Sequence, residues 1–131
     1  PVKGLVNGFY QCGSFTGSWT NYLGVEDMAA VINHTAGGYL FYKTPEYHRI
    51  SRFRGNGVPM DRPGFYVYIR DNEKKDYHSI SCQPVAKDVS KAKYRCRHGL
   101  SYTVYESEYD GLASSQTMVI PRGENVLLWD V

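Results

Sequence analysis

Alternating apolar and polar positions predict β-strands along most of the chain. In GFYVYIR, residues 64–70, the apolar residues Phe65, Val67 and Ile69 alternate with two tyrosines and an arginine. Because successive side chains of a strand point to opposite faces, we expect the apolar set to be buried and the tyrosines to be half exposed. About nine segments fit a short strand. They span residues 4–12, 39–43, 46–53, 64–70, 76–83, 93–99, 100–109, 116–121 and 125–131.

One segment has helical rather than strand spacing. In VEDMAAVINH, residues 25–34, the apolar positions Val25, Met28 and Ile32 fall on one helix face, acidic residues occupy the first turn, and a Gly-Gly pair follows. This pattern predicts one short helix near 25–34. The preceding segment, residues 13–24, is rich in glycine, serine and threonine, which favours a packed loop.

The order of elements predicts an all-β fold. Twelve tyrosines and five phenylalanines favour pleated sheets, and DNEKK at 71–75 is typical of a turn between antiparallel strands. A chain of 131 residues without a linker or repeat predicts one domain, 1–131. We therefore expect a single-domain antiparallel β-sandwich, or a partly closed barrel, of about nine short strands with one short helix. No apolar stretch is long enough to predict a membrane span. Three cysteines allow at most one internal disulfide.

Basic residues are concentrated in two stretches although the formal net charge is only +2. In KYRCR the two-residue period places Lys93, Arg95 and Arg97 on one face, with Tyr94 and Cys96 on the other. Burying such a row unpaired is costly, so it faces water or an anionic partner. It is either a nucleic-acid-binding surface with nearby tyrosines or a charged edge that discourages aggregation. The whole basic patch comprises Arg49, Arg52, Arg54, Lys91, Lys93, Arg95 and Arg97.

The sequence gives little support for a catalytic or metal-binding site. FYQC near the start resembles the opening of small fungal ribonucleases, and Glu46, His48, Arg49 and His78 are the residue types that such an acid–base site needs. The chain has no C-terminal cysteine to complete that family's disulfide, and its histidines and cysteines show no metal-binding spacing. We therefore predict no catalytic residues, no metal, no cofactor and no enzymatic activity, and retain a ribonuclease-like protein as the less favoured alternative.

The first 38 residues, PVKGLVNGFYQCGSFTGSWTNYLGVEDMAAVINHTAGG, resemble the mature start of the flax rust avirulence effectors recognised by the flax L-locus TIR-NB-LRR resistance receptors. The likeness runs through the whole chain and includes no short catalytic motif. It implies a β-sandwich effector that a rust fungus secretes and that acts in the host plant cytoplasm. The start at Pro1, without methionine, agrees with a processed product.

The resemblance also implies a partner and a recognition surface. The partner would be a plant TIR-class leucine-rich-repeat receptor that binds the monomeric effector and triggers the hypersensitive response. We expect recognition at Ile50, Asn56, Ser90 and Cys96, with the basic patch adding electrostatic complementarity. Nucleic-acid binding through that patch is the alternative function.

Overall fold

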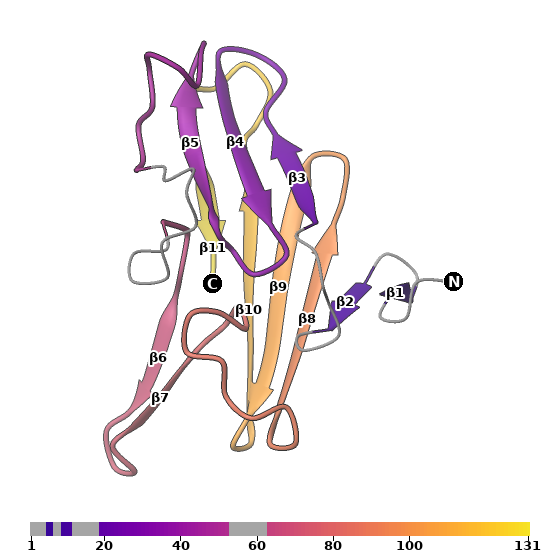
Figure 1. Ribbon diagram of the computed structural model, residues 1–131, viewed down its shortest axis with the longest axis vertical. Coiled ribbons are helices and arrows are strands. Elements are labelled where there is room, and N and C mark those ends of the chain that lie inside the picture. The colour runs from indigo at the N-terminus through magenta and orange to yellow at the C-terminus, as the bar shows by residue number, and fades with distance from the viewer. Residues whose placement is uncertain (1–4, 7–8, 12–18, 53–62) are drawn as a thin grey trace.

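The computed structural model describes residues 5–6, 9–11, 19–52 and 63–131, with side chains described from residue 19. Within these ranges every regular element is a strand and all pairings are antiparallel, which confirms the all-β prediction (Figure 1). The strands are β1 (Leu5–Val6), β2 (Phe9–Gln11), β3 (Thr20–Leu23), β4 (Met28–Asn33), β5 (Gly38–Tyr42), β6 (Tyr68–Asp71), β7 (Asp76–Ser79), β8 (Ala92–His98), β9 (Tyr102–Tyr109), β10 (Leu112–Val119) and β11 (Leu128–Asp130).

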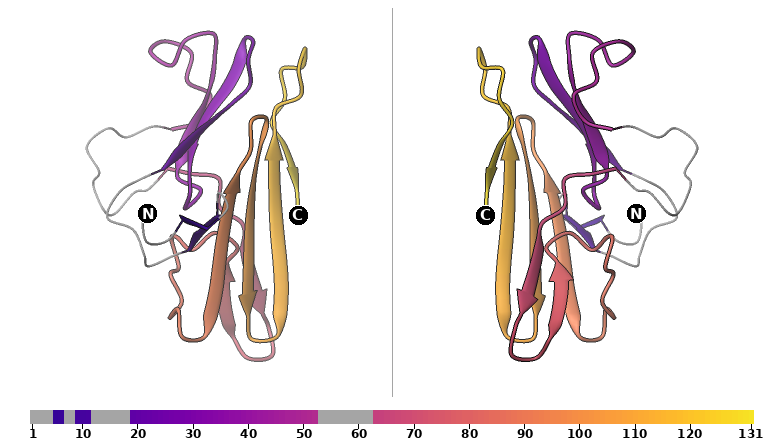
Figure 2. Two further views of the ribbon diagram at one scale, coloured as in Figure 1. Left: turned by 90° about the vertical axis from the view of Figure 1, so that its right-hand side faces the viewer. Right: turned by 90° about the vertical axis from the view of Figure 1, so that its left-hand side faces the viewer.

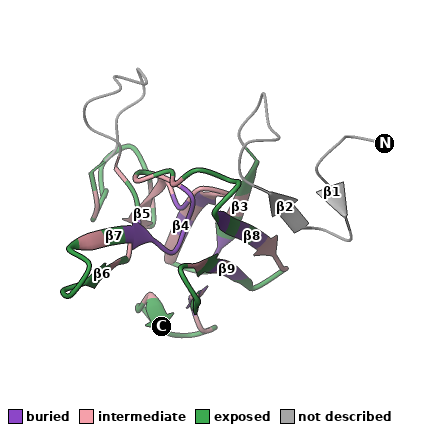
Figure 3. Cartoon of the chain, turned by 90° about the horizontal axis from the view of Figure 1, so that it is seen from below, coloured by how far each residue is buried: buried purple, intermediate pink, exposed green. Residues whose placement is uncertain are grey.

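The strands form three sheets arranged in two layers. A six-stranded sheet has the order β1-β2-β8-β9-β10-β11, and the smaller sheets are β3-β4-β5 and β6-β7. The three-stranded sheet lies beside the upper part of the large sheet (Figure 2). Seen from below, it and the β6–β7 hairpin lie on the same side of β8 and β9 (Figure 3). This arrangement is the expected β-sandwich.

The core lies where the layers meet. Leu23 and Ile32 of the smaller sheet pack in one cluster with Cys96, Tyr105 and Met118 of the large sheet. All five side chains are at most 2% exposed. On β8 the residues that point the other way, Lys93, Arg95 and Arg97, are charged, so the two-residue period of this strand separates a buried face from a more exposed one.

The predicted helix at 25–34 is wrong, because Met28–Asn33 forms strand β4. Met28, Ala30 and Ile32 alternate along a strand, whereas Val25, Met28 and Ile32 fit helical spacing. Pairing of this segment on both sides, with β3 and with β5, decides the outcome. The segment is too short for helix propensity to compete with two ladders of backbone hydrogen bonds. Gly38, expected to stop the helix, instead opens β5, where a Cβ would lie 2.1 Å from the carbonyl oxygen of Val31.

Other strand boundaries also differ from the prediction. Thr20–Leu23 is a strand rather than a loop, and residues 46–52 form turns with a single bridge between Phe41 and Arg49. At 64–70 only residues 68–70 lie in a strand, and the predicted alternation holds in part: Phe65 is 5% exposed and Tyr68 is 54% exposed, whereas Val67 and Ile69 are half-buried rather than buried. Cys82 is disulfide-bonded, whereas Cys96 is a free, buried cysteine. Across the described ranges, the structure contains no helix long and apolar enough to cross a membrane.

Candidate functional site

The basic row on β8 has the predicted orientation. Lys93 and Arg95 are exposed and Arg97 is half-buried, whereas Tyr94 and Cys96 point into the core at 7% and 2% exposure. Burial raises the pKa of the Cys96 thiol, which keeps it protonated and unreactive. A side chain so deeply buried cannot form part of an exposed recognition surface.

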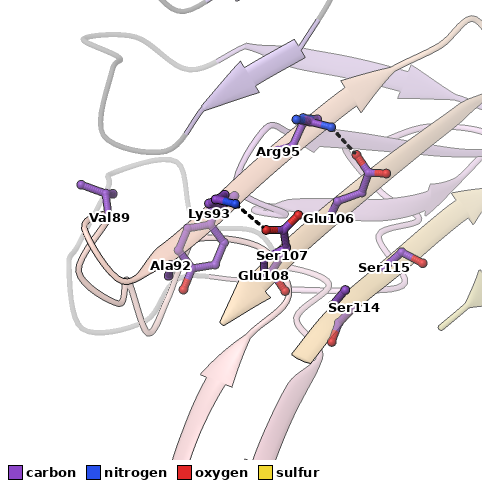
Figure 4. A pocket seen from close by; sticks show the side chains of 11 residues that line it. Val89, Ala92, Lys93, Arg95, Glu106, Ser107, Glu108, Ser114 and Ser115 are labelled. Atoms are coloured by element: carbon purple, nitrogen blue, oxygen red, sulfur yellow. Dashed lines mark hydrogen bonds and ion pairs between the residues drawn. The ribbon is translucent and has the colours of Figure 1, made fainter. Parts of the chain in front are cut away.

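Strand pairing places acidic residues beside the basic row. Lys93 Nζ lies 2.7 Å from Glu108 Oε2, and Arg95 Nη1 lies 3.9 Å from Glu106 Oε2 (Figure 4). Arg97 Nη2 lies 3.8 Å from the other carboxylate oxygen of Glu106. These are cross-strand pairs, since Lys93 is opposite Glu108 and Arg95 is opposite Glu106 in the register. Two carboxylates thus offset much of the positive charge that the isolated row suggests.

A polar groove of about 520 Å³ lies over β8–β10 at these pairs. The hydrogen bond from Lys93 is the largest cause that lowers the pKa of Glu108, so this carboxyl stays ionised and is poorly suited to donate a proton at neutral pH. Glu108 therefore contributes a fixed charge to the groove rather than a general acid. It is lined by Val89, Ala92, Lys93, Tyr94, Arg95, Glu106, Ser107, Glu108, Ala113, Ser114 and Ser115.

The remaining residues singled out from the sequence lie in two separate places. Arg49, Ile50 and Arg52 are exposed in the segment after β5, with Ile50 at 56% exposure. Ser90 and Lys91 are exposed just before β8. Arg54 and Asn56 lie outside the described residues. The structure therefore splits the predicted patch between the end of β5 and the start of β8.

The candidate ribonuclease residues are not brought together. Glu46, His48 and Arg49 lie in the exposed segment where β5 ends, at one end of the molecule, whereas β7, which carries His78, lies at the other end (Figure 1). The guanidinium of Arg49 donates a 3.3 Å hydrogen bond to the backbone carbonyl of Glu46. A phosphodiester cannot contact both histidines in this arrangement.

A tightly connected cluster near His78 was missed by the sequence analysis. Asp76 accepts a 2.5 Å hydrogen bond from Lys87 and a 2.6 Å hydrogen bond from the hydroxyl of Tyr109. The bond from Lys87 is the main reason that the pKa of Asp76 is lowered, and the same contacts raise the pKa values of Lys87 and Tyr109. Lys87 Nζ also lies 5.1 Å from the centre of the Tyr109 ring.

A pocket of about 300 Å³ adjoins this cluster, between the β6–β7 hairpin and the β9–β10 turn. His78 is 4% exposed and its ring centre lies 5.2 Å from that of Tyr109. Its Nε2 is buried without a hydrogen-bond partner in the structure, and burial is the main cause that lowers its pKa. No metal-binding group of histidine, cysteine and acidic residues occurs in the described part of the chain. The pocket is lined by Ile69, Arg70, Asp71, Asp76, Tyr77, His78, Tyr109, Asp110 and Leu112.

Comparison with known proteins gives a consistent result. Residues 14–131 match the family model described as "Glycosyl hydrolase 94, supersandwich domain". The chain is 52% identical over 113 residues to the N,N'-diacetylchitobiose phosphorylase of Vibrio proteolyticus and 50% identical over 113 residues to that of Vibrio furnissii. Each match covers 86% of this chain and 14% of the relative. The solabiose phosphorylase of Paenibacillus borealis is 31% identical over 130 residues, covering 89% of this chain and 16% of the relative.

These matches overturn the functional prediction from the sequence. The resemblance to flax rust avirulence effectors is wrong, and so are the plant receptor as partner, fungal secretion and the host cytoplasm as location, because these relatives are bacterial phosphorylases. The expectation of a non-enzyme is wrong for the same reason. The nucleic-acid-binding and ribonuclease alternatives are overturned with them.

Proposed function

This chain belongs to glycosyl hydrolase family 94 as its supersandwich domain, and on that premise we propose that it is part of a phosphorylase that cleaves N,N'-diacetylchitobiose. In such a reaction the glycosidic C–O bond breaks, an oxygen of inorganic phosphate bonds to the anomeric carbon, and a proton passes to the oxygen of the leaving sugar. The observation that carries the proposal is the 52% identity over 113 residues to the Vibrio proteolyticus enzyme. The lower identity to the solabiose enzyme, 31%, favours the amino-sugar disaccharide as substrate.

We propose that this chain supports catalysis rather than supplying the proton donor. Cleavage of a glycosidic bond needs a carboxylic acid whose pKa is raised so that it can protonate the leaving oxygen. Asp76, Asp88 and Glu108 have pKa values shifted in the opposite direction by hydrogen bonds. The chain spans about one-seventh of the Vibrio relatives, which leaves most of such an enzyme to provide the reacting groups.

A segment exchange tests the proposed function. The matching segment of the Vibrio proteolyticus phosphorylase is replaced by this chain, and release of sugar phosphate from N,N'-diacetylchitobiose and inorganic phosphate is measured. We expect the chimera to retain activity, whereas the Vibrio enzyme without the segment should lose it. A chimera that folds and assembles like its parent but does not cleave the disaccharide contradicts the proposal. Solabiose serves as the alternative substrate, and a preference for it would overturn the substrate assignment.

We also propose that residues 1–131 form a single folding unit, as the sequence predicts. Limited proteolysis of the chain, followed by mass spectrometry, checks this. A resistant product that retains both layers of the sandwich is expected. Accumulation of a stable fragment that contains only one layer would show that the layers fold separately.

A further inference from the structure

The pocket between the β6–β7 hairpin and the β9–β10 turn combines ring faces with hydrogen-bonding groups, and we propose that it binds one hexopyranose ring of a neutral sugar. Tyr77 is 53% exposed and Tyr109 is half-buried, and the aliphatic side chains of Ile69 and Leu112 complete its apolar part. Lys87 Nζ lies over one face of each ring, 5.7 Å from the centre of Tyr77 and 5.1 Å from that of Tyr109, so a sugar would present its C–H groups to the other, negatively polarised face. A volume of about 300 Å³ is at the small end of ligand pockets, which suits a single ring.

His78 supplies a polar atom that has no hydrogen-bond partner among the described residues. The residue is only 4% exposed, and its Nε2 is buried and makes no hydrogen bond within the described part of the chain. Burial and the nearby charge of Lys87 outweigh the attraction of Asp76, so the ring is neutral at pH 7. A neutral imidazole can donate to or accept from a hydroxyl. Because Nε2 is inaccessible to solvent, a sugar hydroxyl would pair with it only after the ring turns toward the pocket, which would remove the cost of leaving this atom unpaired.

The charges around the pocket favour a neutral ligand over an anion. Its lining contains one arginine and three aspartates. Two of these carboxylates are held by lysines, since Asp76 binds Lys87 and Asp110 binds Lys74. The lysines therefore neutralise carboxylates instead of leaving positive charge for a phosphate. Hydroxyl groups, which accept and donate hydrogen bonds without carrying charge, match such a lining.

Two contacts hold the pocket in shape. The hydrogen bond from Tyr109 to Asp76, at 2.6 Å, connects the hairpin to the end of β9, and the ion pair between Lys74 and Asp110 connects it to the β9–β10 turn. A ligand that enters a pocket already held in shape loses little free energy to ordering its walls.

The proposed phosphorylase function guides only the choice of probe sugars. The ¹⁵N-labelled chain is titrated separately with N-acetylglucosamine, N,N'-diacetylchitobiose and inorganic phosphate, and amide chemical shifts are followed by NMR. We expect both sugars to shift amides within 69–78 and 109–112, and phosphate to leave them unchanged. Absence of sugar-dependent shifts in these segments, or a response to phosphate alone, would overturn the proposal.

Matched variants identify the groups responsible. Tyr77→Ala removes an exposed ring and should raise the dissociation constant for the sugar about tenfold. His78→Phe keeps a ring in the core but removes Nε2, and should weaken binding by a similar factor. Tyr22→Ala, at a tyrosine that is 67% exposed on β3, is the control and should bind as the parent does. Equal affinities for the Tyr77→Ala and Tyr22→Ala chains would rule out this pocket, whatever the segment exchange shows for phosphorolysis.

Discussion

The hydroxyl of Tyr105 in β9 donates a 2.6 Å hydrogen bond to the backbone carbonyl of Asn33 at the end of β4. Tyr105 is 1% exposed, and burial is the main cause that raises the pKa of its hydroxyl well above the usual value. The bond joins residues 72 positions apart and links the two layers of the sandwich. A phenol at this depth is retained because its one polar atom has a partner in the opposite layer.

Tyr105→Phe should therefore reduce stability without changing the fold. Removing the hydroxyl leaves the Asn33 carbonyl with the amide of Ala36, at 3.0 Å, as its donor. We therefore expect the free energy of unfolding to fall by about 1 kcal/mol, the net contribution of one hydrogen bond. Urea denaturation followed by fluorescence measures the change. The control is Tyr102→Phe on the same strand, where the side chain is 38% exposed and the effect should stay within about 0.5 kcal/mol. Equal losses of stability for the two variants would contradict a stabilising role for the hydrogen bond from Tyr105 to Asn33.

Asn21 provides a second connection between the layers. Its Nδ2 donates to the carbonyls of Gly99 and Tyr102 at 2.9 and 3.2 Å, and to Thr103 Oγ1 at 3.1 Å. Asn21→Asp replaces this donor by a carboxylate that faces two carbonyl oxygens, so we expect a loss of about 1–3 kcal/mol at pH 7.

The loss of stability in Asn21→Asp should depend on pH, because a protonated carboxyl can again donate a hydrogen bond. Denaturation measured at pH 7 and at pH 3.5 should show a smaller difference from the parent in acid. Asn125→Asp, at an exposed position in the loop before β11, is the control and should differ little from the parent at either pH. A larger deficit for Asn21→Asp in acid would show that donor loss is not the cause.

Alanine substitutions at two glycines should distinguish the cost of backbone strain from the cost of steric overlap. Gly24 and Gly123 have φ of 85° and 81°, in the left-handed region that disfavours other residues. A Cβ at Gly24 would lie 2.2 Å from the carbonyl oxygen of Met28, whereas nothing lies within 4 Å at Gly123. We expect Gly123→Ala to cost about 1–2 kcal/mol and Gly24→Ala clearly more, because β3 and β4 would have to separate. Thermal unfolding of both chains measures the difference, and similar melting temperatures would contradict it.

The sequence predicted features that depend on local alternation and missed those that depend on tertiary contacts. The two faces of β8 and the burial of Phe65 were predictable because a two-residue period sorts neighbouring side chains. The helix prediction at 25–34 failed because its apolar positions satisfy both periods. Asp76 and Tyr109 are 33 positions apart, and no motif spans them, so their contact and the adjacent pocket appear only in the fold. The effector resemblance had no chemical motif to support it, which left it open to correction by direct comparison.

His98 should make the protein less stable in mild acid. Its Nδ1 lies 3.0 Å from Thr103 Oγ1, and burial is the main cause that lowers its pKa to about 4, with His34 nearby acting in the same direction. An unfolded histidine titrates near 6.5, so between these values the unfolded chain binds more protons and stability falls as the pH falls. The stabilising effect is complete above about pH 6.5, and its loss by pH 4 is at most about 3 kcal/mol for this residue.

Denaturation at half-unit steps from pH 7.5 to 4 measures this dependence. The pKa values of His34 and His78 are also lowered by burial, so His98→Gln should reduce the slope rather than abolish it. His48→Gln, in the exposed segment after β5, is the matched control and should keep the parent slope. The comparison is between the slopes of stability against pH, so a His98→Gln chain that is less stable at every pH still gives a valid test. An unchanged slope in His98→Gln, or a parent chain that gains stability on acidification, would show that His98 does not titrate as its burial predicts.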